Sequence, residues 1–164
     1  MGKCRLMNKT GLEIVEEFIW EEIARDLARE KEVERCLCLP DRFRAKLLSA
    51  GVGFPLEEFP GSAADLFLGW QILAEESAIL TPEEIFSSLK PGGEARIFGF
   101  YSSPRPEEVR EWAGRVKGKE PPGLPPPGAV SLGAVAGWLK TGPFGRYTIR
   151  KRGIYYDCRL GKEI

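Results

Sequence analysis

The sequence contains no histidine among its 164 residues. This absence excludes Ser-His and Cys-His catalytic pairs, His-ligated zinc or haem, and an imidazole that changes its charge near neutral pH. It does not exclude enzymes that only have to orient a reactive cofactor, because orientation requires no imidazole.

The chain also lacks net charge, since 24 basic side chains balance 24 acidic ones. This balance argues against binding to nucleic acid or membrane by bulk electrostatics. No apolar stretch approaches the length of a membrane span, and no signal peptide precedes Glu13. We therefore expect a soluble, cytoplasmic protein that does not bind membranes, and we disfavour nucleic acid as a partner.

Cysteine is scarce, and the four that occur are too scattered for a disulfide scaffold. Cys36 and Cys38 would face the same side of a strand, and together with Cys4 and Cys158 they could form a four-thiolate metal site. Their spacing matches no standard zinc or iron–sulfur pattern. We favour buried packing residues and expect no metal site.

Short apolar runs alternate with capped amphipathic segments along the chain. Thr-x-x-Glu capping boxes predict helices that begin after Thr10 and after Thr81. Strands alternating with helices predict a parallel sheet with helical crossovers, and the chain closes with an antiparallel hairpin. The expected strands are Val33–Leu39, Phe54–Phe59, Ala63–Leu68, Glu94–Phe100 and the hairpin Arg146–Arg150 with Ile154–Leu160, and the expected helices are residues 10–31, Arg42–Ala50, 81–89, 103–118 and Ser131–Leu139.

The segment Ala64–Phe100 resembles a known family. ADLFLGWQIL, followed by TPEEIFSSLKPGGEARIF, is similar to the fourth and fifth strands of the class I S-adenosylmethionine-dependent methyltransferases, and Leu89–Gly93 matches the turn between them. The resemblance extends from Val33 to the C-terminus. It implies an α/β fold in one domain, residues 1–164, with a Rossmann-like methyltransferase-type sheet. This sheet would be mostly parallel, carry an antiparallel C-terminal hairpin, and be shortened at its N-terminal side.

The family's glycine-rich cofactor loop, which follows its first strand, has no counterpart here. Two alignments are open. If VERCLCL (residues 33–39) is the family's second strand, the helix in residues 1–32 is appended or replaces the first strand–loop–helix unit. If it is the first strand, residues 40–43 replace the glycines and a strand–helix unit is missing. Either alignment damages cofactor binding.

Ligands of doubly wound sheets bind beyond the carboxyl ends of the strands. A glycine there admits a ligand close to the backbone, and an aromatic ring can stack on it, although such rings are also typical of cores and interfaces. Asp41 can also cap the helix that follows it, and we favour that role because helix starts strongly prefer Asp. The candidates are Asp41, Glu57, Gly69 and Trp70 for the cofactor, and Gln71 and Tyr101 for a substrate.

The closing hairpin is rich in basic side chains. They suit protection of an exposed sheet edge, or contact with an acidic partner or with phosphates. The neutrality of the whole chain favours protection.

Two classes of function follow from these observations. We expect a methyltransferase-like protein with a degenerate cofactor site that acts as a non-catalytic interaction or assembly module. Its N-terminal helix would fill the vacant region, or pair with a second copy or another protein. The alternatives are a small S-adenosylmethionine-dependent methyltransferase acting on an unknown small molecule, and a binding protein for another small ligand. S-adenosylmethionine and no cofactor are left equally open.

Overall fold

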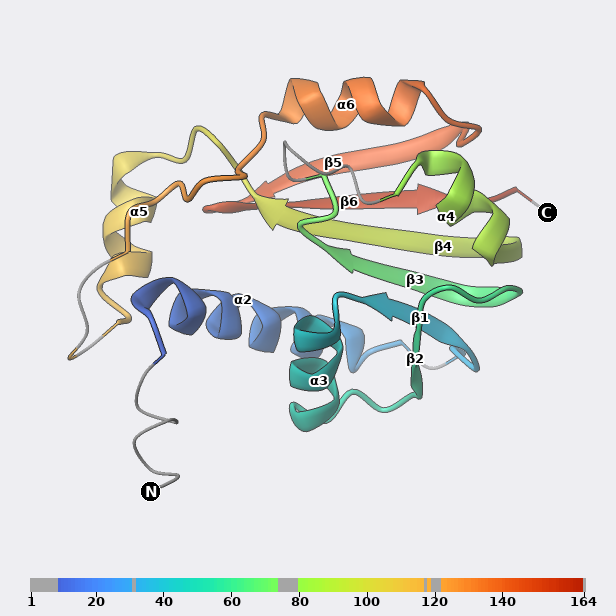
Figure 1. The fold of residues 1–164 in the computed structure, drawn as a ribbon, viewed down its shortest axis with the longest axis horizontal. Coiled ribbons are helices and arrows are strands. Elements are labelled where there is room, and N and C mark those ends of the chain that lie inside the picture. The colour runs from blue at the N-terminus through green and yellow to red at the C-terminus, as the bar shows by residue number, and fades with distance from the viewer. Residues whose placement is uncertain (1–8, 31, 74–79, 117, 119–121, 164) are drawn as a thin grey trace.

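The computed structural model describes residues 9–30, 32–73, 80–116, 118 and 122–163. Within them, one sheet lies between two helical layers (Figure 1). The strands are β1 (Cys36–Leu39), β2 (Leu56–Glu58), β3 (Ala64–Trp70), β4 (Leu89–Phe100), β5 (Arg146–Arg152) and β6 (Tyr155–Gly161), and the helices are α2 (Gly11–Leu27), α3 (Asp41–Ser49), α4 (Pro82–Ser88), α5 (Pro106–Ala113) and α6 (Leu132–Lys140). None of these helices is long and apolar enough to cross a membrane.

The strand order is β2-β1-β3-β4-β6-β5. The first four of these strands are parallel to one another, whereas β6 is antiparallel to both β4 and β5. The predicted α/β fold class, a mostly parallel sheet with an antiparallel C-terminal hairpin, is therefore confirmed. The chain order reverses between β1 and β3, which makes their junction the switch point of the sheet.

Helix α2 forms for the local reasons that the sequence provides. The Glu13 N–H donates to Thr10 Oγ1 at 3.1 Å, and the Thr10 N–H donates to Glu13 Oε1 at 3.4 Å. The same reciprocal pattern opens α4 at Thr81. The buried face of α2 consists of Val15, Ile19, Trp20, Ile23, Ala24 and Leu27.

The sheet separates two apolar cores. Helices α2, α3 and α5 contribute to one core, and α4 and α6 contribute to the other. Cys36 and Cys38 lie buried in the first core, whereas Cys158 lies in the second. The sheet therefore separates Cys158 from the other two thiols, and Cys4 lies outside the described residues. Burial raises the pKa of Cys38 and that of Cys158 to about 12, so both thiols stay protonated at neutral pH.

The segment predicted as a turn, Leu89–Gly93, instead lies inside β4. Leu89 pairs with Ala64 and Glu94 pairs with Leu66, so the residues between them form a bulge. Gly92 has a φ of +84°, and a Cβ on Gly93 would approach the Ala64 carbonyl oxygen to 2.9 Å. The expected start of this strand at Glu94 was wrong, because the glycines shape a bulge that sequence periodicity does not reveal.

Candidate functional site

The switch point lies at the carboxyl ends of β1 and β3, where Leu39 pairs with Gly69. In doubly wound sheets the first and fourth strands are neighbours at this place. Because β1 pairs directly with β3, residues 33–39 occupy the place of the family's first strand. This is the second of the two alignments that the sequence left open.

The connection from β1 to α3 is a single proline. Pro40 stands at the helix N-cap, and Asp41 is already the first residue of α3. Proline has no backbone N–H, and its ring restricts the backbone. The connection therefore has neither the glycines nor the free N–H groups with which a glycine-rich loop approaches a ligand.

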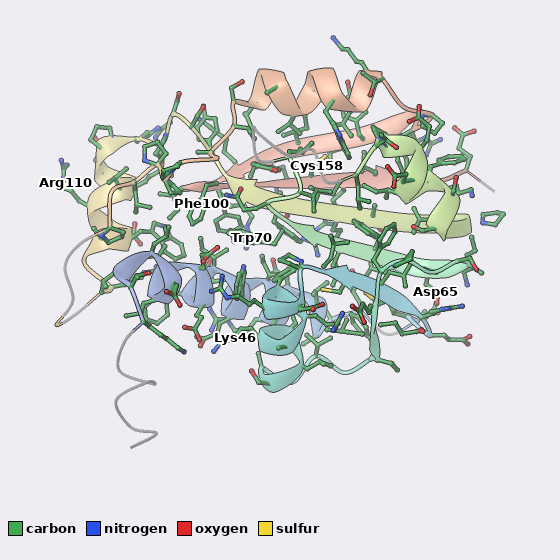
Figure 2. All side chains as sticks on the ribbon, in the orientation of Figure 1. Lys46, Asp65, Trp70, Phe100, Arg110 and Cys158 are labelled. Carbon is green, nitrogen blue, oxygen red and sulfur yellow. The ribbon has the colours of Figure 1, made fainter. Side chains whose placement is uncertain are left out.

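Trp70, the last residue of β3, is 3% exposed and packs on the α2 side of the sheet. Its ring centroid lies 5.8 Å from that of Trp20, 5.2 Å from that of Phe100 and 6.2 Å from that of Phe43. Figure 2 shows Trp70 and Phe100 between the sheet and α2. This aromatic cluster (Trp20, Phe43, Trp70 and Phe100) covers the indole, so its faces are not free to stack on a ligand.

Glu16 of α2 is the polar partner of this cluster. Trp70 Nε1 donates to Glu16 Oε2 at 2.9 Å, and Arg42 Nη2 lies 3.5 Å from Glu16 Oε1. The Arg42 guanidinium also lies over the Trp20 ring, 5.3 Å from its centroid. Burial raises the pKa of Glu16, although the Trp70 hydrogen bond and the Arg42 charge both oppose this rise. The carboxylate is therefore held by protein groups at the point where a ligand would enter.

Gln71 and Gly69, two of the predicted site residues, take part in the packing of β3. Gln71 has a φ of +57°, its N–H donates to the Phe98 carbonyl at 2.8 Å, and its Oε1 accepts from the Phe100 N–H at 2.9 Å. A Cβ on Gly69 would lie 3.1 Å from side-chain atoms of Phe67 and Ile72. Gln71 thus links the end of β3 to β4 by two hydrogen bonds, and the absence of a Cβ at Gly69 leaves space for the Phe67 and Ile72 side chains.

Asp41, Glu57 and Tyr101 do not converge with Trp70. The Asp41 side chain is 74% exposed and pairs with Arg44 at 3.1 Å. It makes no capping hydrogen bond, so the prediction that Asp41 caps α3 was wrong, because Pro40 takes the N-cap position. Glu57 Oε2 pairs with Arg35 Nε at 3.0 Å, near the start of β1 and away from its carboxyl end.

Tyr101 lies on the other side of β4, where its N–H donates to the Ile154 carbonyl. The Lys151 ammonium lies 5.2 Å from the centroid of its ring. The site therefore joins two predicted residues, Trp70 and Gln71, with three that sequence reasoning missed, namely Glu16, Trp20 and Arg42. The local signal for Glu16 and Trp20 was an acidic and an aromatic residue one turn apart on the first predicted helix, and Arg42 had no such signal.

No protein-family model matches the sequence, and no curated protein resembles it. Solved structures do share its architecture. Human N-acetylserotonin methyltransferase in complex with SAM superposes with a TM-score of 0.56 at 13% identity, over 94% of this chain and 56% of that one. An O-methyltransferase family protein from Burkholderia thailandensis gives a TM-score of 0.52 at 13% identity, over 93% and 58%.

A SAM-dependent methyltransferase from Thermotoga maritima gives a TM-score of 0.54 at 13% identity, over 92% of both chains. The chain spans little more than half the length of the human and Burkholderia proteins, but nearly all of the Thermotoga protein. These likenesses confirm the class I methyltransferase-like fold. At 13% sequence identity these likenesses establish the fold alone, and a shared fold does not imply a shared function.

Proposed function

We propose that this chain is a methyltransferase-like protein with a degenerate S-adenosylmethionine site, which works without methyl transfer as an interaction or assembly module. The observation that carries the proposal is the passage from β1 to α3 through Pro40 alone. A nucleotide-type cofactor needs backbone N–H groups and glycines at this turn. The proline supplies neither, and although no side chain caps the first N–H groups of α3, no glycine lets a ligand approach them closely, so the residues present do not fit the cofactor.

The aromatic cluster supports the same proposal. A cofactor entering the α2 side of the switch point would have to displace Trp70 from its three ring contacts and from Glu16. Removing such a side chain from a core costs about 3–5 kcal/mol. A cost of that size would weaken binding of the cofactor by about a hundredfold to several thousandfold, since each 1.4 kcal/mol corresponds to a factor of ten in the dissociation constant.

Calorimetric titration with S-adenosylmethionine and S-adenosylhomocysteine tests the degenerate site. We expect no saturable heat, and no shift of the thermal unfolding midpoint at millimolar ligand. A dissociation constant below about 1 mM for either compound would overturn the proposal.

For the module, the partner surface that we propose is the outer side of α2 together with α3, with a second copy of the chain as its partner. The apolar face of α2 packs in the core of its own chain, so only the outer side of the helix is available to a partner. Glu17 and Glu21 lie there and share Lys46 of α3, while Leu48 of α3 is an apolar side chain that is 48% exposed. Acidic, basic and apolar groups side by side suit a self-complementary contact.

Sedimentation velocity of the intact chain tests this assembly. Deleting α2 would expose the core, so we choose the point variant Leu48→Glu, with Lys140→Glu on α6 as its matched control. We expect a dimer at micromolar concentration that Leu48→Glu dissociates and Lys140→Glu does not. A monomer for the unchanged chain, or equal dimers for both variants, would contradict the assembly role.

A second candidate is a small S-adenosylmethionine-dependent methyltransferase, which the likeness to the human enzyme in complex with SAM favours. For this function the aromatic cluster would have to open and Asp41 and Glu57 would have to move, so that these two residues together with Gly69 and Trp70 could hold the cofactor while Gln71 and Tyr101 faced a substrate. Saturable binding of S-adenosylmethionine in the calorimetric titration would select this candidate. Heat from another small molecule alone would instead select a binding protein.

A further inference from the structure

A polar cavity of about 300 Å³ lies on the α2 side of the C-terminal hairpin, between the end of α2 and strands β4, β5 and β6. It is separate from the switch point, which lies between β1 and β3. Five arginines and three carboxylates line it. The arginines are Arg29, Arg96, Arg150, Arg152 and Arg159.

The pairing of the strands brings these arginines to one face of the sheet. Arg96 of β4 lies opposite Arg159 of β6, and Arg150 of β5 lies opposite Asp157 of β6. Cross-strand partners share a face, and two like charges directly opposite one another destabilise a sheet. Protection of the sheet edge explains charges on β5 but not this pair, because β4 and β6 are interior strands.

The cavity keeps a positive charge after its internal ion pairs are counted. Arg96 Nη2 lies 3.0 Å from Asp157 Oδ2, and Arg152 Nη1 lies 2.5 Å from Asp26 Oδ2. Within each of these pairs the positive and the negative charge cancel. The remaining lining charges are three arginines (Arg29, Arg150 and Arg159) and one carboxylate (Glu30), which leaves two positive charges on the lining itself. Glu94 adjoins the cavity, and its carboxylate offsets part of the charge of Arg159 and Arg96.

Two buried polar atoms of the same cavity are still without partners. Arg96, whose side chain is 2% exposed, has no hydrogen-bond partner for its Nε among the residues that the structure describes. The Oδ1 atom of Asp157 is likewise unpartnered within that set. A buried unsatisfied polar group is costly. Both atoms are covered, but their side chains line the cavity, so small shifts of these side chains would bring them to the acceptor oxygens and the hydroxyl of a bound ligand.

We propose that this cavity binds the phosphate group of a small ligand. The guanidinium fork of arginine matches phosphate oxygens in a bidentate manner. A phosphate dianion would balance the two positive charges of the lining, with Arg29, Arg150 and Arg159 around it and Arg96 Nε as a further donor once its side chain shifts. The volume lies at the lower end of the usual range for ligand sites, so the ligand is of phosphomonoester or diphosphate size.

Calorimetric titration of the intact chain with inorganic phosphate and inorganic pyrophosphate tests this site. We expect saturable binding that weakens as salt is added, because the contacts are ionic. Arg159→Gln and Arg150→Gln should each weaken binding about ten- to hundredfold, which is the effect of losing a charge-assisted hydrogen bond. Arg110→Gln is the matched control, because Arg110 is exposed on α5 and does not line the cavity. Figure 2 shows its position on that helix.

Three results would overturn the proposal. They are the absence of saturable heat at millimolar ligand, an equal loss of affinity in Arg110→Gln and Arg159→Gln, and binding of succinate as tight as that of pyrophosphate. Thermal unfolding of each variant separates a lost site from a lost fold. Arg150→Gln lies on the edge strand β5 and provides the second test if Arg159→Gln does not fold. S-adenosylmethionine carries no phosphate, so this experiment is independent of the cofactor titration.

Discussion

Replacing Trp70 with alanine removes an indole that is 3% exposed and contacts three other aromatic rings. Truncating a buried tryptophan to alanine costs about 3–5 kcal/mol. The variant also removes the Trp70 Nε1–H group, which donates a hydrogen bond to Glu16. Because Glu16 keeps Arg42, this second loss adds about 1 kcal/mol. We expect the free energy of unfolding to fall by about 4–6 kcal/mol.

The variant Trp70→Phe separates the two contributions. It keeps an aromatic ring in the cluster but removes the hydrogen bond to Glu16, so we expect a loss of about 1–2 kcal/mol. It should also change the pH dependence of stability. Burial raises the pKa of Glu16 in the folded state, and the Trp70 donor opposes that rise, so the variant should raise this pKa further.

The sign of the pH effect follows from linkage. Between the unfolded and the raised folded pKa of Glu16, the native state binds more protons than the unfolded state does. Stability therefore decreases as pH rises through this interval, and the penalty persists above it. We expect a wider interval in Trp70→Phe, and no contribution from this residue in Glu16→Gln.

Urea denaturation followed by far-ultraviolet circular dichroism, repeated across the acidic range, measures these quantities. Trp138→Ala is the control, because Trp138 is only half-buried on α6 and should cost less than Trp70. A loss below about 1 kcal/mol for Trp70→Ala would refute a core role. Trp70 would then be free to bind a ligand.

Two other predictions concern paired charges. Arg96→Met should lower the free energy of unfolding by about 3–5 kcal/mol, because it leaves the buried Asp157 carboxylate without its 3.0 Å partner. Adding Asp157→Leu should recover most of that loss. Equal losses for the single and the double variant in urea denaturation would contradict this expectation. Burial raises the pKa of Asp65, but the Lys90 ion pair and two backbone N–H donors outweigh it and hold that pKa below its usual range. The stability that Asp65 contributes is therefore present above the ordinary pKa of about 3.9 and lost as pH falls through the folded value, and Asp65→Asn should remove this part of the acid sensitivity.

Much of the fold could be predicted from the sequence because its signals are local. The capping boxes at Thr10 and Thr81 depend on residues three positions apart, and the buried runs of β1 and β3 are continuous. The bulge in β4 could not be predicted in this way. It depends on how Leu89 and Glu94 pair with β3, which no local pattern records.

The candidate site was predictable only in part. The rule that ligands bind at the carboxyl ends of strands selected Trp70 and Gln71, which lie at the switch point. Glu16, Trp20 and Arg42 reach the same place only because α2 and α3 pack across the sheet. Their roles depend on tertiary contacts between residues far apart in the chain, so helical periodicity alone could not identify them.

We propose that the switch point does not accept S-adenosylmethionine. A nuclear magnetic resonance titration of the isotope-labelled chain tests it directly, by following the amide signals of Leu39, Asp41 and Gln71, which flank Pro40 and Trp70. We predict that these signals do not move as the compound is raised to millimolar concentration. Saturable shifts at these three amides would show a working cofactor site and contradict the account.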